Sequence, residues 1–232
     1  GAPMENYFEK GKPFPARGPF MLQTHGGEIR WRAVYVRDIP ADEAQRELAT
    51  PPLPNPSQFD IAYGPHPKQL IHFWKAESAT PTPLLLFIHG GGFNDGDKAR
   101  SRELNIAENL TLKGYVCLSI NYKLRRMQGQ VTWPQSVYDA KAAVRYLRKE
   151  AANLGIDPEK IGVIGCSAGG NLAMMLATTG PADGFDAVKG EPYQDISARV
   201  TCAIDFYGAV DLMNYHDTVS YTHLTLPTNR EV

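Results

Sequence analysis

Cysteine is scarce in this chain, and its pattern excludes a disulfide framework. The 232 residues include three cysteines, Cys117, Cys166 and Cys202. The number is odd, and each thiol lies inside or beside an apolar segment, where it packs like any other small apolar side chain. We therefore expect buried free thiols and a fold that is held together by its apolar core.

An excess of one charge and a long apolar run are missing as well. Lysine and arginine number 24 against 25 aspartates and glutamates, so the formal net charge is −1 and no basic field attracts nucleic acid. No uninterrupted apolar run approaches the ~18 residues that a membrane-spanning helix needs. With 43% apolar residues, the chain is instead expected to form one soluble globular domain over residues 1–232 that acts on a small molecule.

A signal peptide is not evident at the start of the chain. Such a peptide has a charged segment followed by an apolar one, and the first residues have neither. The letters Gly-Ala-Pro before Met4 resemble the remnant of a cleaved tag. The native N-terminus is then hidden, and the cellular location stays open, export included.

From Pro83 onward, short apolar runs alternate with amphipathic stretches. Apolar runs without polar alternation are typical of strands buried on both faces of a parallel sheet. The stretch 134–152 carries its apolar residues on one stripe at helical spacing. We expect strands at 83–88, 115–120, 160–165 and 200–206, and helices at 99–113, 134–152 and 168–178. This alternation predicts an α/β fold with helices on both faces of the sheet.

The first third of the chain is less regular. Residues 29–36 and 69–74 have the composition of strands, the second one antiparallel and near an edge. The proline-rich stretch 49–57 is expected to form an extended loop. No internal repeat is visible.

A serine lies between glycines where a predicted strand meets a predicted helix. The stretch Gly165-Cys166-Ser167-Ala168-Gly169 follows the apolar run "KIGVIG" and opens a helical pattern. A tight turn of this kind strains the serine backbone, and the flanking glycines remove side chains that would collide. The helix start directs free N–H groups toward any oxyanion formed beside Ser167. The alternative is a glycine-rich turn that merely packs a helix on a strand.

A second glycine cluster, "HGGGF", follows another predicted strand. After His89, three consecutive glycines can expose their backbone N–H groups at the carboxyl end of a strand, where α/β sheets bind ligands. That arrangement is what an oxyanion hole requires. Taken alone, the cluster could also be a flexible loop with a structural histidine.

Other uses of these glycines do not fit the spacing. A phosphate-binding loop needs lysine after its second glycine, and Asp97 stands there after Gly96. A dinucleotide-binding turn needs a G-x-G-x-x-G pattern, which the residues after Gly165 break. No nucleotide cofactor is therefore expected. The four histidines upstream of the serine lack metal-ligand spacing, so no metal is expected either. They are His25, His66, His72 and His89.

The sequence around both motifs resembles the α/β-hydrolase superfamily, and within it the hormone-sensitive-lipase-like esterases. "HGGGFNDGDK", "SINYKL", "IGVIGCSAGGNLA" and "AIDFYGAVDL" are similar to bacterial carbohydrate-ester esterases of the acetylxylan and feruloyl esterase group, over residues 59–212. The resemblance implies a doubly wound, mostly parallel sheet. It implies a serine esterase with Ser167 as nucleophile. The N–H groups of Gly91, Gly92 and Ala168 would form the oxyanion hole, and His89 would support the loop.

The resemblance also implies that part of the enzyme is missing. In this superfamily the acid and then the base follow the serine, in loops near the last two strands. Only one expected strand, 200–206, follows Ser167 here. We therefore expect a C-terminally truncated esterase that lacks the last two strands and the triad acid and base. Its activity on short-chain or carbohydrate-linked esters would be weak or absent.

The residues after the serine offer poor substitutes for the base. His216 follows Asp211 too closely to occupy a separate strand-end loop, and His223 lies in the tail 219–232. That tail fits nothing in the family and resembles the translated adapter that closes many metagenomic reading frames. Whether either histidine can replace the base is left open. The possible acids downstream of Ser167 are the aspartates Asp183, Asp186, Asp195, Asp205, Asp211 and Asp217.

Two other functions stay possible on the sequence alone. The chain could be a non-catalytic remnant of the fold that binds a ligand or associates with itself, or an amidase or peptidase on the same scaffold. Without neighbouring strands, residues 200–206 would form an exposed sheet edge, which favours pairing with another copy.

Overall fold

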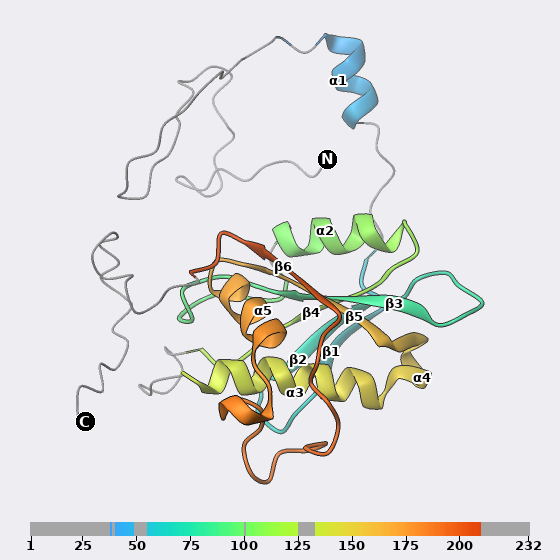
Figure 1. The fold of residues 1–232 in the computed structure, drawn as a ribbon. Helices are drawn as coiled ribbons and strands as arrows, with labels where there is room; N and C mark the ends of the chain where they lie inside the picture. Colours follow the sequence, from blue (N-terminus) through green and yellow to red (C-terminus); the bar gives the residue numbers. More distant parts are fainter. Residues whose placement is uncertain (1–37, 39, 49–54, 100, 125–132, 210–232) are drawn as a thin grey trace, which may run out of the picture. The chain divides into compact units, whose positions relative to one another are not determined.

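The computed structural model describes residues 38, 40–48, 55–99, 101–124 and 133–209 (Figure 1). The chain divides into two compact units. Helix α1 (Ala41–Leu48) belongs to the first unit, and every other described element belongs to the second. The predicted strand at 29–36 lies outside the described residues, and helix α1 was not predicted. One domain over residues 1–232 stays a prediction.

The second unit is built on a six-stranded, mostly parallel sheet. Its strand order is β1-β2-β4-β3-β5-β6; β2 is antiparallel to both β1 and β4, and the other neighbours are parallel. The strands are β1 (Gln58–Ala62), β2 (Leu70–Trp74), β3 (Thr82–Ile88), β4 (Val116–Ile120), β5 (Ile156–Cys166) and β6 (Cys202–Phe206). The predicted doubly wound α/β fold is confirmed, as is the antiparallel strand near one edge.

The register of the central strands determines where a site can form. Ile88 at the end of β3 pairs with Ile120 of β4 and with Gly165 of β5. The carboxyl ends of three neighbouring strands therefore lie level with one another. In an open α/β sheet this edge is where ligands bind, and both glycine motifs begin here.

Helices cover the two faces of the sheet (Figure 1). Helix α2 (Ser101–Thr111) packs on β2, β3 and β4, while α3 (Gln135–Lys149) and α5 (Ala168–Thr178) pack on each other and on β5. The two faces carry separate clusters of buried apolar side chains. No helix among the described residues is long and apolar enough to cross a membrane.

Two predicted boundaries differ from the structure by more than two residues. The single helix predicted at 134–152 breaks at Glu150, and a short helix α4 (Ala151–Leu154) follows and ends at Gly155, which has a left-handed backbone. Strand β5 starts at Ile156 rather than at 160, because its first residues extend the strand while still partly exposed.

The cysteines follow the predicted pattern at two of three positions. Cys117 and Cys166 are buried free thiols, and burial raises the pKa of Cys117 to about 12. Cys202 is exposed, so the expectation for it is wrong. The reason is its place on β6, the last strand of the described sheet order.

A fully buried carboxylate, Asp139 on α3, ties the helix to two strand ends. Its oxygens accept hydrogen bonds from the side-chain amides of Gln69 (3.0 Å) and Gln135 (2.9 Å) and from the backbone N–H of Lys123 (2.8 Å). The Lys123 ammonium lies 3.7 Å from the same carboxylate. A buried charge is tolerated only when it is paired and hydrogen-bonded in this way.

Replacing Asp139 should therefore destabilise the fold. Asp139→Ala leaves three buried or half-buried donors without their acceptor, and we expect it to lower the free energy of unfolding by about 3 kcal/mol in urea denaturation. Asp195→Ala makes the same chemical change at an exposed position and should cost less than about 0.5 kcal/mol. Equal costs for the two variants would contradict the role of Asp139.

Candidate active site

Ser167 occupies a sharp turn between a strand and a helix. Strand β5 ends at Cys166, helix α5 begins at Ala168, and Ser167 between them has φ 54° and ψ −120°. Its own N–H donates to the carbonyl of Phe206 (2.9 Å), and its carbonyl accepts from the N–H of Asn171 (3.1 Å). This backbone conformation is costly for a residue other than glycine, and such strain is concentrated at functional sites. The side chain at the turn is exposed.

Glycines around Ser167 allow α5 to start unusually close to the sheet. A Cβ atom at Gly165 would overlap the carbonyl oxygen of Gly169, and one at Gly169 would overlap the carbonyl oxygen of Ile88. Only residues without a side chain fit between these backbones. The helix start is therefore held directly against the ends of β3 and β5.

The triglycine loop lies against the same serine. A Cβ atom added to Gly90 would lie 3.1 Å from the Cβ of Ser167 and 2.7 Å from the carbonyl oxygen of Cys166. Gly91 has φ 125°, and its carbonyl accepts the N–H groups of Asn94 and Asp95, both at 3.0 Å. The two glycine motifs, which are far apart in the sequence, thus meet at one point of the sheet edge.

His89 is buried beneath the loop. Its ring stacks on that of Tyr122, with centroids 4.5 Å apart and planes 15° from parallel. Its Nδ1 lies 2.7 Å from the Gly90 carbonyl oxygen, and the Tyr122 hydroxyl donates to the His89 carbonyl (2.9 Å). These contacts suit the predicted supporting role of His89. Tyr122 was not identified from the sequence, although it lies in the quoted "SINYKL".

The far end of the loop is anchored to Asn121. The Asn121 side chain donates to Asp97 (2.7 Å) and accepts from the backbone N–H of Lys98 (2.6 Å). Burial alone would raise the pKa of Asp97, but the hydrogen bonds from Asn121 and from the Ala99 N–H bring it below its usual value. Asp97 is therefore a charged anchor of the loop, at the position where a phosphate-binding loop would need lysine.

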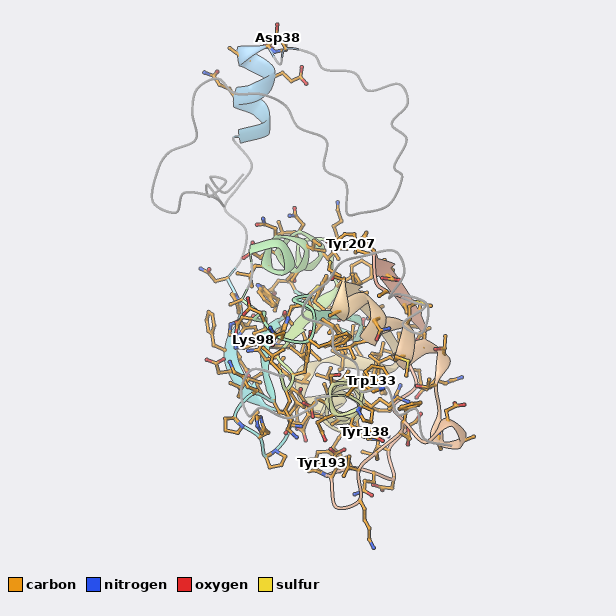
Figure 2. The ribbon with its side chains drawn as sticks, turned by 90° about the vertical axis from the view of Figure 1, so that its left-hand side faces the viewer. Asp38, Lys98, Trp133, Tyr138, Tyr193 and Tyr207 are labelled. Carbon is orange, nitrogen blue, oxygen red and sulfur yellow. The ribbon has the colours of Figure 1, made fainter. Side chains whose placement is uncertain are left out.

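Three aromatic side chains form an apolar wall next to the triglycine loop. Phe93 belongs to the loop itself, and its ring centroid is 6.2 Å from that of Trp133, which in turn is 6.1 Å from Phe185. All three are partly exposed and pack on the main apolar core. Tyr138, labelled with Trp133 in Figure 2, donates to the carbonyl of Gly184 and holds the segment before Phe185. No pattern in the sequence indicates that these residues meet.

A general base beside Ser167 is not found in the described part of the chain. The Ser167 hydroxyl makes no hydrogen bond to any described residue, and it does not cap α5. His66 lies in a turn before β2, and His72 lies on β2 near Asp60, where burial lowers its pKa. His216 and His223 lie outside the described residues.

The candidate acids downstream of the serine have other partners. Asp186 pairs with Arg145, Asp183 accepts from the N–H of Gly180, and Asp205 accepts from the N–H of Gly208. Asp195 is exposed, and Asp211 and Asp217 lie outside the described residues. Among the residues that the structure describes, no three histidines, cysteines or carboxylates gather as metal ligands.

Comparison with known proteins places the chain among esterases. A family model described as BD-FAE matches residues 71–230. Esterase LipC of Mycobacterium tuberculosis (strain ATCC 25618 / H37Rv) is 31% identical over 153 residues, which are 65% of this chain and 36% of LipC. Among solved structures, the thermophilic esterase Est2 of Thermogutta terrifontis with propionate bound is 30% identical, with a TM-score of 0.54 over 60% of this chain and 49% of Est2.

A third similarity concerns the fold alone. A truncated form of a carbohydrate esterase from gut microbiota has a TM-score of 0.60 at 23% identity, over 70% of this chain and 60% of that one. The chain spans about half of the length of Est2 and less of LipC. Because the family model matches most of the chain and the sheet has the expected order, the chain belongs to the BD-FAE family and has the α/β-hydrolase fold.

Proposed function

We propose that this chain is the nucleophile-bearing part of a serine carboxylic-ester hydrolase. The observation that carries the proposal is the strained turn at Ser167 with the triglycine loop directly against it. Named esterases among the relatives, LipC and Est2, support the reaction class. The substrates we propose are short-chain or carbohydrate-linked esters.

The reaction would proceed through an acyl-enzyme. The Ser167 oxygen attacks the ester carbonyl and forms a bond to its carbon, while the hydroxyl proton passes to a base. The negative charge that develops on the carbonyl oxygen is held by the N–H groups of Gly91, Gly92 and Ala168, each worth about 3 kcal/mol. The ester C–O bond then breaks, the alcohol leaves with the proton held by the base, and water hydrolyses the acyl-enzyme, which releases the acid and restores the serine.

The described part of this chain offers no acceptor for the hydroxyl proton of Ser167. No described residue accepts it, so we propose that the acid and base belong to two further strands of a longer parent protein. The greater length of the relatives supports this view. In another serine hydrolase, loss of the base costs about 10⁶ in kcat, while the oxyanion hole and binding leave about 10³ over water.

A non-catalytic role is the second candidate. The lack of a described base at Ser167 favours a remnant that keeps the fold and binds ligands. An amidase or peptidase is a third possibility, which turnover of anilide substrates would identify.

The first prediction concerns the serine itself. We expect a fluorophosphonate probe to label the chain slowly, and p-nitrophenyl acetate to be hydrolysed far more slowly than by intact esterases, because the base is missing. Ser167→Ala should abolish both signals, whereas Ser78→Ala, an exposed serine in another loop, should change neither. Labelling that survives in Ser167→Ala would refute the nucleophile. Hydrolysis at full esterase rates that vanishes in Ser167→Ala would refute the missing base.

The second prediction separates two neighbouring glycines of the loop. A Cβ at Gly91 would overlap the carbonyl oxygen of Asp95, whereas one at Gly92 meets no atom within 4 Å. Both alanine variants keep their backbone N–H. We expect Gly91→Ala to slow fluorophosphonate labelling at least about tenfold, since one oxyanion donor is worth about 10² or more. Gly92→Ala, with only a modest backbone cost, should stay within about threefold. Equal rates in the two variants would argue against a loop that stabilises the oxyanion.

The third prediction concerns self-association through β6. Among the described residues β6 pairs only with β5, and its exposed side chains, Cys202, Ile204 and Phe206, carry no charge that would keep another strand away. We propose that a second copy pairs with this edge. Light scattering should show dimers or larger species at high concentration, and Ile204→Lys should shift them to monomers.

Leu112→Lys is the matched control for this edge. Leu112 is 60% exposed after α2, so the same charge is added away from β6, and association should persist. A wild-type chain that stays monomeric at every concentration would contradict pairing through β6. So would association that Ile204→Lys leaves intact.

A further inference from the structure

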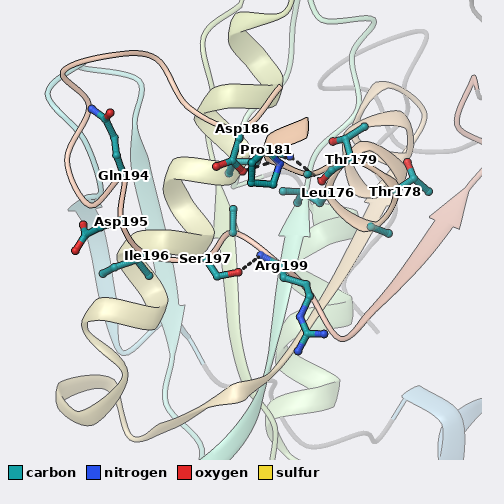
Figure 3. A pocket seen from close by; sticks show the side chains of 14 residues that line it. Leu176, Thr178, Thr179, Pro181, Asp186, Gln194, Asp195, Ile196, Ser197 and Arg199 are labelled. Carbon is teal, nitrogen blue, oxygen red and sulfur yellow. Dashed lines mark hydrogen bonds and ion pairs between the residues drawn. The ribbon is translucent and has the colours of Figure 1, made fainter. Parts of the chain in front are cut away.

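A pocket of about 520 Å³ lies at the C-terminal end of α5, away from the serine (Figure 3). It is lined by residues 176–181 and 194–199, together with Lys141 and Asp186. Ser167 and the triglycine loop are not part of it. Helix α5 separates the two places by its 11 residues, or about 16 Å. The volume is in the range of small-molecule sites.

Two buried cations lie at this pocket: Lys141 lines it, and Arg145 lies behind the lining residue Asp186. Lys141 and Arg145 lie one turn apart on α3, and each side chain is 1% exposed. Both meet the same carboxylate, Asp186, with Arg145 at 2.7 Å and Lys141 at 3.8 Å. No other described carboxylate is within ion-pair distance of either cation. Among the described residues, the two buried cations thus share one carboxylate at ion-pair distance, and Asp183 acts on Lys141 only from farther away.

Each of the two cations has hydrogen-bonding capacity that the described residues do not fill. The Lys141 ammonium donates to the carbonyl of Thr179 (2.9 Å), while its contact with Asp186 is too long for a hydrogen bond. Arg145 donates to the carbonyls of Ile196 and Asp186, but its buried Nη1 has no acceptor among the described residues. Burial lowers the pKa of Lys141, although the nearby carboxylates of Asp186 and Asp183 act in the opposite direction. A negatively charged oxygen acceptor in the pocket would satisfy the Lys141 ammonium, which lines it.

The rest of the lining limits the charge and the shape of such a ligand. Leu176, Pro181, Ile196 and Ala198 supply apolar surface. At the exposed rim, Arg199 and Asp195 carry opposite charges, and Figure 3 shows Asp195 beside Gln194 on the loop that borders the pocket. The carboxylates of Asp186 and Asp195 disfavour a dianion. A single negative charge on a short aliphatic body matches the lining.

We propose that this pocket binds a small monocarboxylate, with its carboxylate on Lys141 and its aliphatic part on the apolar lining. Lys141 supplies the charge and the donor, and Leu176, Pro181, Ile196 and Ala198 supply the apolar surface. It is independent of the ester chemistry proposed for Ser167, so either proposal can fail without the other.

The test is a titration of the isotope-labelled chain with sodium butyrate, followed by backbone amide NMR at constant ionic strength. We expect saturable shifts at Thr179, Gly180, Ile196 and Ala198. Butyramide, the uncharged analogue, should give none, and inorganic phosphate should bind more weakly than butyrate. Equal shifts with butyramide would overturn the role of charge. Tighter binding of phosphate would overturn the monoanion, and shifts confined to residues 165–171 would place butyrate at the serine instead.

Three variants test the site itself. Lys141→Met should weaken butyrate binding at least about tenfold, because it removes the central charged donor. Lys149→Met makes the same change on an exposed part of α3 and should have no effect.

Gly180→Leu fills the pocket from a position with an extended backbone and open space around its Cβ, so it should fold and still lose binding. It therefore tests the pocket even if Lys141→Met fails to fold. Unchanged affinity in Gly180→Leu would refute the site.

Discussion

The structure around Ser167 depends on one close approach between backbones. Helix α5 starts so near the ends of β3 and β5 that Gly165 and Gly169 leave no room for a Cβ atom. The chain must turn from strand to helix within one residue, and Ser167 makes this turn by adopting a positive φ. This strain is retained because the packing of a buried helix on a buried sheet outweighs it. The exposed hydroxyl and the free N–H groups of the helix start follow from the same contact.

The segment that leaves β4 connects the site to the rest of the fold. Three consecutive residues each hold a different part: Asn121 anchors the far end of the triglycine loop, Tyr122 holds His89 beneath it, and Lys123 donates to Asp139 on α3. The loop beside the serine is thus fixed by polar contacts that are largely buried, where each hydrogen bond is costly to lose. None of these contacts uses the backbone N–H groups of Gly91 and Gly92.

Much of the sheet could be predicted because its central strands are buried on both faces. Short apolar runs such as 83–88 and 115–120 are typical of strands that are buried on both faces of a sheet. The glycines around Ser167 indicate a tight turn that residues with side chains rarely make. The break of the helix at Glu150 could not be predicted, because the apolar stripe continues through it into α4. Strand β1 was missed because most of its side chains are exposed, so it lacks the buried pattern.

The sequence by itself determined the α/β class, the two glycine motifs and their position at strand ends, because these features depend only on local composition and spacing. Only the tertiary structure decided which distant residues meet. It brought Phe93, Trp133 and Phe185 together from three segments, and it put two cations of α3 against one aspartate at the far end of α5. Such contacts between residues distant in the sequence depend on how helices and loops pack on the sheet. Packing of that kind is a property of the whole fold and leaves no periodic trace in any single stretch of sequence.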